Sequence, residues 1–202
     1  MNEKEGIYMS DLVLKDLFVN TSDYANKKIT VEGWVKTVRD SKTFGFIELN
    51  DGSYFKNVQI VFTDKLSNFE DLTKLTISST IKVTGILVIT ENAKQPFEIQ
   101  AKEIVIESLC STDYPLQKKR HSFEYLRTIA HLRPRTNTFN AVFRIRSVAA
   151  FAIHEYFQSH GYVYVNTPII TCADCEGSAE MFKLTTLDTD KPLPMKDGKT
   201  DY

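Results

Sequence analysis

Residues 44–62, FGFIELNDGSYFKNVQIVF, contain two short runs in which alternate side chains are apolar. The first run is closed by Asn50-Asp51-Gly52-Ser53, four residues that favour turns. A period of two is typical of a half-buried strand, whose side chains point alternately to the core and to solvent. Phe46 shares a face with Glu48, and Gln59 lies between apolar neighbours. We therefore expect Phe46 and Gln59 on the outer face of a two-stranded unit.

Three further strand patterns lie at residues 29–36, 81–89 and 97–106. Residues 67–75 interrupt the strands after the third one. There, Ser67 is followed three residues later by Glu70, a spacing that predicts a capping box and a short helix. Five short strands with a helix after the third indicate an all-β Greek-key barrel of the OB type, with an SH3-like barrel as the alternative.

Barrels of the OB type bind single-stranded nucleic acid on the face formed by strands 2 and 3. An exposed aromatic ring stacks on a base, and a neighbouring amide hydrogen-bonds to a base edge. Phe46 and Gln59 are the candidates here, with Phe44 as a possible second ring. The alternative is that residues 8–18 cover Phe46.

The chain after the barrel changes character. Residues 110–120 contain Pro115 and show no periodicity, which is typical of a linker. Ser122 then begins a predicted short helix that runs to His131.

A longer helix is predicted from Thr136 or Asn137 to Gly161, which stops it in the C′ position. Apolar residues recur there at three and four positions, and Ile145 widens the apolar stripe. A stripe this broad indicates either burial against both its own domain and a partner subunit, or a wholly internal helix. A strand is expected at residues 162–165.

Composition narrows the class of protein. The chain has 202 residues, 25 Lys plus Arg against 26 Asp plus Glu, and 42% hydrophobic residues, as in an ordinary soluble protein. It lacks a secretory signal and an apolar run long enough to span a membrane, so we expect a cytoplasmic protein with no membrane partner. The near-neutral total hides a basic stretch: residues 115–146 carry eight basic side chains and one acid, Glu124. The plain interpretation of that stretch is a solvated linker and helix face.

The run HGYVYVNTPII, residues 160–170, resembles motif 1 of the class II aminoacyl-tRNA synthetases. In that family the motif is a long helix, a glycine-aromatic turn and a strand that ends in proline. The barrel is similar to the anticodon-binding domain of the subclass for aspartate, asparagine and lysine, through the segments at 33–35, 38–40, 45–48 and 58–62. The resemblance covers the chain in order from about Asp11 to Phe182.

Within the subclass, residues 174–182, DCEGSAEMF, look most like the bacterial asparagine enzymes. The resemblance implies an OB-fold anticodon-binding domain at 1–109, a linker or hinge at 110–135, and the incomplete start of an α+β catalytic domain at 136–202. Motif 1 is the one motif of the catalytic domain present. Motifs 2 and 3, which carry the ATP-binding arginines, are not in the sequence.

The resemblance also implies roles for particular residues. Phe46 would stack on the central anticodon base, Gln59 would bind a base edge, Arg39 would contact a base or a phosphate, and Glu98 would contact the anticodon. Glu176, Gly177 and Ser178 would lie in a mobile loop that binds the amino acid. Gly161 and Pro168 would lie at the interface of a homodimer.

The implied function of the full-length parent is ATP-dependent and Mg²⁺-dependent attachment of asparagine to its tRNA. This piece would be inactive, with no catalytic residue and no bound cofactor, and would supply anticodon recognition and dimer contacts. The alternatives are a piece of an aspartate or lysine enzyme, or a non-catalytic OB-type RNA-binding module. Cys172 and Cys175 have the spacing of a metal or redox pair, but a single pair is a weak signal and no metal site is expected.

Overall fold

The computed structural model describes residues 12–90, 95–171, 182, 184–188 and 190–200. The chain divides into two units, one up to Ala152 and one from Ile153. The domain boundaries expected at 109/110 and 135/136 stay predictions.

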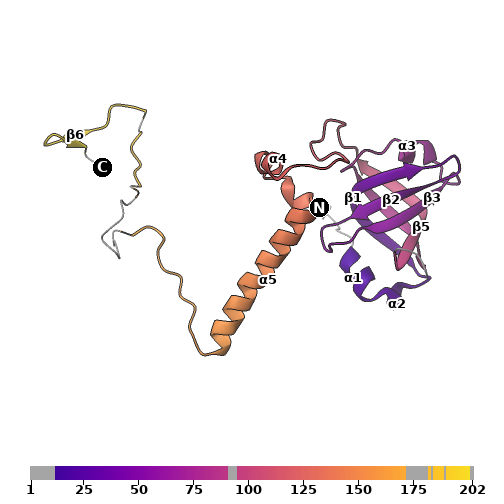
Figure 1. Ribbon diagram of the computed structural model, residues 1–202. Coiled ribbons are helices and arrows are strands. Elements are labelled where there is room, and N and C mark those ends of the chain that lie inside the picture. The colour runs from indigo at the N-terminus through magenta and orange to yellow at the C-terminus, as the bar shows by residue number, and fades with distance from the viewer. Residues whose placement is uncertain (1–11, 91–94, 172–181, 183, 189, 201–202) are drawn as a thin grey trace, which may run out of the picture. The chain divides into compact units, whose positions relative to one another are not determined.

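The first unit is built on a five-stranded barrel (Figure 1). Its strands are β1 (Lys28–Asp40), β2 (Phe44–Asn50), β3 (Val58–Thr63), β4 (Thr80–Ile89) and β5 (Phe97–Ser108). They close in the order β1-β2-β3-β5-β4, and the β3–β5 pair is parallel while the other pairs are antiparallel. The OB-type barrel predicted from the alternating pattern is confirmed.

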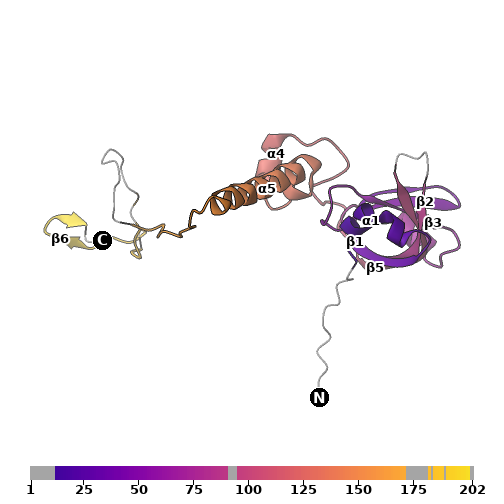
Figure 2. The same cartoon turned by 90° about the horizontal axis from the view of Figure 1, so that it is seen from below.

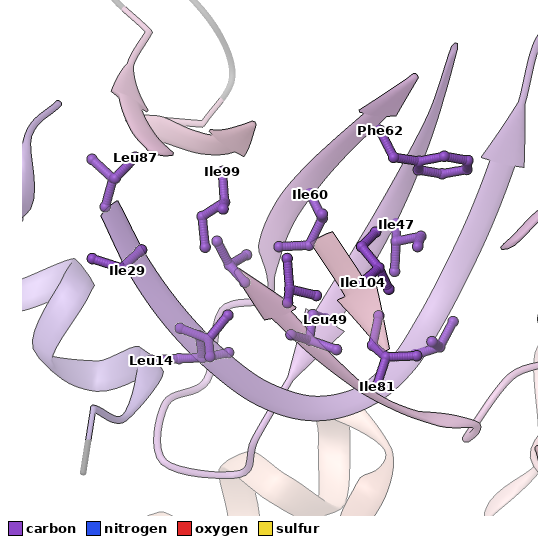
Figure 3. Packing of buried hydrophobic residues seen from close by; sticks show 14 of the residues in the cluster. Leu14, Ile29, Ile47, Leu49, Ile60, Phe62, Ile81, Leu87, Ile99 and Ile104 are labelled. Carbon is purple, nitrogen blue, oxygen red and sulfur yellow. The ribbon is translucent and has the colours of Figure 1, made fainter. Parts of the chain in front are cut away.

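The barrel encloses one apolar core, to which every strand contributes (Figure 3). Val31, Ile47, Leu49, Ile60 and Ile99 have no exposed side-chain surface at all. Burial of each such side chain stabilises the fold by about 1.5–3 kcal/mol. Because successive side chains of a strand alternate, the residues between them are forced to the outside.

Two short helices, α1 (Leu14–Val19) and α2 (Thr21–Tyr24), precede the barrel and pack against it (Figures 1 and 2). Leu14 and Leu17 are fully buried in the core. The backbone N–H of Leu14 donates to a carboxylate oxygen of Asp51 at 2.7 Å, which ties the helix to the turn between β2 and β3.

A third short helix, α3 (Phe69–Thr73), follows β3 as predicted, but its predicted capping box is wrong. The residue before the helix is Asn68, and its side chain makes no capping hydrogen bond. Its amide instead donates to the backbone carbonyl of Ile104 in β5 at 2.8 Å. The cap position therefore anchors the helix to the barrel, which a local sequence signal does not reveal.

The connector forms α4 (Phe123–Thr128) and a 3₁₀ turn, η1 (Arg133–Arg135), before the long helix α5 (Asn137–Ser159). The helix start predicted at Ser122 is confirmed, and the Ser122 hydroxyl caps the helix by accepting from the backbone N–H of Tyr125 at 3.2 Å. The helix ends earlier than the predicted His131.

Arg144, Arg135 and Lys36 make the contacts between the barrel and the segment that contains η1 and α5. Arg144 of α5 donates to the backbone carbonyl of Gly52 at 2.6 Å, and Nε of Arg144 donates to the side chain of Asn140 at 2.7 Å. The guanidinium of Arg135 lies 4.8 Å from the ring centre of Trp34 in β1. Lys36 in turn donates to the backbone carbonyl of Arg135 at 2.8 Å. The loop after β2 and the outside of β1 thus hold the connector.

The predicted stop of α5 at Gly161 is confirmed. Gly161 has φ of +83°, its N–H donates to the carbonyl of Gln158, and that of Tyr162 donates to Phe157. This pair of bonds is a Schellman motif, and the rings of Phe157 and Tyr162 meet edge-on with their centres 5.4 Å apart.

The strand expected at residues 162–165 is wrong, since these residues have no regular secondary structure. A strand needs a neighbour for its backbone hydrogen bonds. In the described part of the second unit, the strands are the short pair β6 (Met195–Lys196) and β7 (Lys199–Thr200), which hydrogen-bond to each other.

No residue of α5 is buried, so the wholly internal helix is wrong for this chain. Ile145, Val148 and Phe151 are each more than two-thirds exposed. Among the described residues, no helix is both long and apolar enough to cross a membrane.

The closeness of β4 to β5 predicts a strict need for glycine at position 85. A Cβ at Gly85 would lie 2.5 Å from the backbone oxygen of Gln100, which has no freedom to move aside. We expect Gly85→Ala to lower the free energy of unfolding by about 1–3 kcal/mol, measured by urea denaturation. Lys102→Ala, at an exposed position of β5, is the control and should change it by less than about 0.5 kcal/mol. Equal stability of Gly85→Ala and the wild type would contradict this reading of the strand packing.

Candidate nucleic-acid interface

The strand register brings the four sequence-predicted barrel residues to the outer face. Arg39 of β1 is paired with Phe46 of β2, and Glu48 of β2 is paired with Gln59 of β3. Residues paired directly across antiparallel strands lie on the same face. Glu98 of β5 joins them through a hydrogen bond from the amide of Gln59.

Phe46 is half-buried on this face, and its ring meets that of Phe44 edge-on with the centres 5.5 Å apart. Phe44 is 42% exposed. The expected second ring is therefore present beside the first. Arg39, directly across from Phe46, is exposed.

The alternative that residues 8–18 cover Phe46 receives no support from the contacts of that segment. Leu14 and Leu17 enter the core, and the ring of Phe18 stacks on Tyr54 with centres 4.9 Å apart. Residues 8–11 lie outside the described residues.

A row of amides and carboxylates continues the face beside Phe46. The amide nitrogen of Gln59 donates to Glu98 at 3.4 Å, and the amide oxygen of Gln59 accepts from Gln95 at 3.3 Å. Further along the face, Asn57 donates to the carboxylate of Glu48 at 3.2 Å. Sequence reasoning missed Gln95, because it precedes β5 in a loop, where no periodicity assigns it to a face.

This face can hold a base in three ways. The Phe46 ring offers a stacking surface, Gln59 retains hydrogen-bonding capacity toward a base edge, and Arg39 supplies a positive charge for a phosphate or a base. Phe46 and Gln59 are diagonal neighbours on adjacent strands, so one base reaches both.

A second feature is a basic groove, of about 1100 Å³, between the barrel and the connector. Its cationic lining residues are Lys36, Lys118, Lys119, Arg120 and Arg135. Among the described residues that line it, none is an aspartate or a glutamate. The basic stretch was evident from the sequence, whereas its meeting with Lys36 and Trp34 of β1 was not.

Positive charges lie close together in the groove. Burial and the charge of Arg135 lower the pKa of the Lys36 amine, against a smaller opposing effect of Glu48. An anion in the groove would relieve this repulsion.

The other predicted site residues belong to the second unit. Gly161 forms the end of α5 and Pro168 is exposed in the second unit. Glu176, Gly177 and Ser178 lie outside the described residues, as do Cys172 and Cys175. In the described part of the chain, no three potential metal ligands cluster.

Two family descriptions match the chain in succession. Residues 29–107 match "OB-fold nucleic acid binding domain", and residues 120–193 match "tRNA synthetases class II (D, K and N)". The first span coincides with the barrel, and the second begins in the connector, before α4.

Curated relatives are similar over almost the whole chain. The asparagine–tRNA ligase of Clostridium beijerinckii is 61% identical over 191 residues, which are 95% of this chain and 41% of the relative. That of Acetivibrio thermocellus is 62% identical over 195 residues, 96% of this chain and 42% of the relative. The chain thus spans about two fifths of the length of these relatives.

Solved structures agree. The asparaginyl-tRNA synthetase of Pyrococcus horikoshii, complexed with asparaginyl-adenylate, is 26% identical, with a TM-score of 0.72 over 84% of this chain and 39% of its own. In sequence and in order of domains, the chain is therefore similar to the N-terminal portion of the class II asparaginyl-tRNA synthetases.

Proposed function

We propose that this chain is the tRNA-recognising and dimer-forming portion of an enzyme that joins asparagine to its tRNA. The observation that carries the proposal is the outer face of the barrel, where Phe46, Gln59 and Arg39 combine a ring, an amide and a cation within reach of one base. The 61% identity to an asparagine–tRNA ligase supports asparagine rather than aspartate or lysine as the amino acid.

The reaction proposed for the whole enzyme has two steps. Asparagine is first activated by ATP to asparaginyl-adenylate, and the asparaginyl group is then transferred to the tRNA. The adenylate in the Pyrococcus horikoshii complex supports this order. Mg²⁺ would accompany ATP, and Glu176, Gly177 and Ser178 would contact the amino acid, with the Glu176 carboxylate suited to an ammonium group.

The basic groove supports a second contact to the same RNA. Double-stranded and folded RNA presents phosphates, which lysine and arginine bind without regard to sequence. Lys118, Lys119 and Arg120 are exposed in the groove, whereas the guanidinium of Arg135 is held over Trp34. The first three are therefore the cations available to a phosphate.

The dimer proposal rests on α5. Its exposed apolar side chains include Ile145 and Val148, 68% and 69% exposed, which are large residues to leave in water. Pairing with a second copy of the chain would bury them, and the resemblance assigns Gly161 and Pro168 to the same interface.

The stacking role predicts that Phe46→Ala weakens binding of an asparagine tRNA anticodon hairpin about 5- to 150-fold, because a base–aromatic stack contributes roughly 1–3 kcal/mol. Fluorescence anisotropy measures the affinity. Phe55→Ala removes another exposed ring, 46% exposed in the loop after β2, and should leave the affinity unchanged. Equal affinities of Phe46→Ala and wild type would remove Phe46 from the site.

If the groove binds RNA phosphates, removal of its exposed cations should make the affinity for tRNA less dependent on salt concentration. Replacing Lys118, Lys119 and Arg120 by glutamine should weaken binding of the whole tRNA and flatten the plot of log affinity against log salt by roughly 0.7–0.9 per lost phosphate contact. The matched control replaces Lys15, Lys27 and Lys28, all exposed and outside the groove lining, by glutamine. An unaltered slope in the triple variant would show that the groove binds no phosphate.

If α5 forms the dimer interface, substitutions on its exposed apolar side should halve the molar mass measured in solution. The double variant Ile145→Glu, Val148→Glu should be monomeric by light scattering at concentrations where the wild type is dimeric. Ser147→Glu, on another side of α5, should leave the mass unchanged. A wild type that is monomeric throughout would contradict the role of α5 in this chain.

A further inference from the structure

The cations of the basic groove lie on two sides of it. Lys36, half-buried, belongs to the barrel, whereas the exposed Lys118, Lys119 and Arg120 belong to the connector. The Lys36 amine uses one of its three donors on the backbone carbonyl of Arg135, at 2.8 Å, so two remain. The groove volume of about 1100 Å³ is just above the usual range of small-molecule sites. A small anion that enters the groove therefore meets positive charge from both sides.

The barrel side of the groove also carries two features that an ordinary surface rarely has. Ser78 has φ of +70°, a left-handed conformation that is uncommon for a residue with a Cβ. Its hydroxyl accepts from the guanidinium of Arg135 at 3.3 Å. The indole Nε1 of Trp34 is buried and has no hydrogen-bond partner among the described residues. Strained backbone and unpaired buried donors gather at functional sites, which favours a binding role for this side of the groove.

The connector adds an aromatic side chain to the groove. Phe123 lines the groove and is 51% exposed, and its ring meets that of Phe139 with the centres 5.9 Å apart. An exposed ring stacks on any of the bases, because every base has a π-face. Cations that bind phosphates and a ring that binds a base are the two elements that a nucleotide requires.

We propose that the groove is a binding site for a free nucleoside polyphosphate, whose phosphates lie between Lys36 and the exposed cations 118–120 and whose base stacks on Phe123. A free polyphosphate is small enough to reach the half-buried Lys36, whereas the backbone of a folded RNA contacts the exposed cations. The inference goes beyond the proposed function. Because the exposed cations are also the proposed contacts for tRNA phosphates, the nucleotide and the tRNA exclude each other. The nucleotide concentration thereby regulates the affinity for tRNA.

Calorimetry on the whole 202-residue chain tests the site with GTP, inorganic triphosphate and guanosine. GTP is the probe because ATP is the co-substrate proposed for the whole enzyme. We expect GTP to bind about 5- to 150-fold more tightly than triphosphate, the factor that one base–aromatic stack supplies, and guanosine not to bind measurably. Trp34 is the single tryptophan of the chain, so its fluorescence should change over the same range of GTP concentration. Triphosphate that binds as tightly as GTP would overturn the proposal, as would an unchanged Trp34 emission.

Two variants locate the base and the phosphates separately. Phe123→Leu should lower the GTP affinity to that of triphosphate, whereas Phe55→Leu, at an exposed ring outside the groove lining, should not. Lys119→Gln should weaken GTP and triphosphate by the same factor, and Lys102→Gln, exposed on β5, should weaken neither. Thermal unfolding checks that each variant remains folded. A ratio of GTP to triphosphate affinity that survives Phe123→Leu contradicts the stacking of the base.

Competition with RNA separates this inference from the proposed function. GTP should displace the whole asparagine tRNA but not an anticodon hairpin, because the hairpin is proposed to contact the outer face around Phe46 alone. Displacement of the hairpin as well would place GTP on that face and overturn the inference, and a whole tRNA that saturating GTP leaves bound would overturn the shared use of the cations. If the hairpin binds and GTP does not, this inference alone fails. If GTP binds and the hairpin does not, the proposed function fails and the nucleotide site stands.

Discussion

Closure of the five strands around one core is the constraint on which the rest of the first unit depends. In a closed barrel each strand has one inner and one outer face, and the apolar side chains take the inner one. Ile47 and Leu49 therefore turn Phe46 and Glu48 outward, and Ile60 turns Gln59 outward. The candidate nucleic-acid face is therefore made of the side chains that alternate with the core residues, and a shift of register by one residue would bury it.

The turn between β2 and β3 links the barrel to its neighbours on both sides. The Asp51 carboxylate accepts from the backbone of α1, and the Gly52 carbonyl accepts from Arg144 of α5. The turn itself is held by local bonds, such as that from the Gly52 N–H to the Asn50 side chain at 2.8 Å. The outer face around Phe46 and the basic groove consequently belong to the same structural unit, and both are candidate contacts for one RNA.

A structural feature could be predicted from the sequence when the residues that stabilise it lie close together along the chain. The strands were predictable because alternation is imposed by burial at neighbouring positions. The helix start at Ser122 was predictable because the hydrogen bond that stabilises it joins residues only three positions apart. The capping box at Ser67 failed because Asn68 is engaged by Ile104, a residue 36 positions distant. The strand at 162–165 failed because a strand forms by pairing, and a local pattern does not say whether a partner is present.

The sequence by itself determined the class of barrel, the candidate residues Phe46 and Gln59, and the similarity to the class II synthetases, since each is written in local patterns of residues. The tertiary structure alone decided how those residues combine. Gln95, Gln59 and Glu98 come from a loop and two strands, and become one hydrogen-bonded row because β3 and β5 are paired in the closed barrel. The basic groove likewise requires the connector to lie against β1, through Arg135 and Trp34. Contacts of this kind join residues tens of positions apart, and so they exist only once the chain has folded.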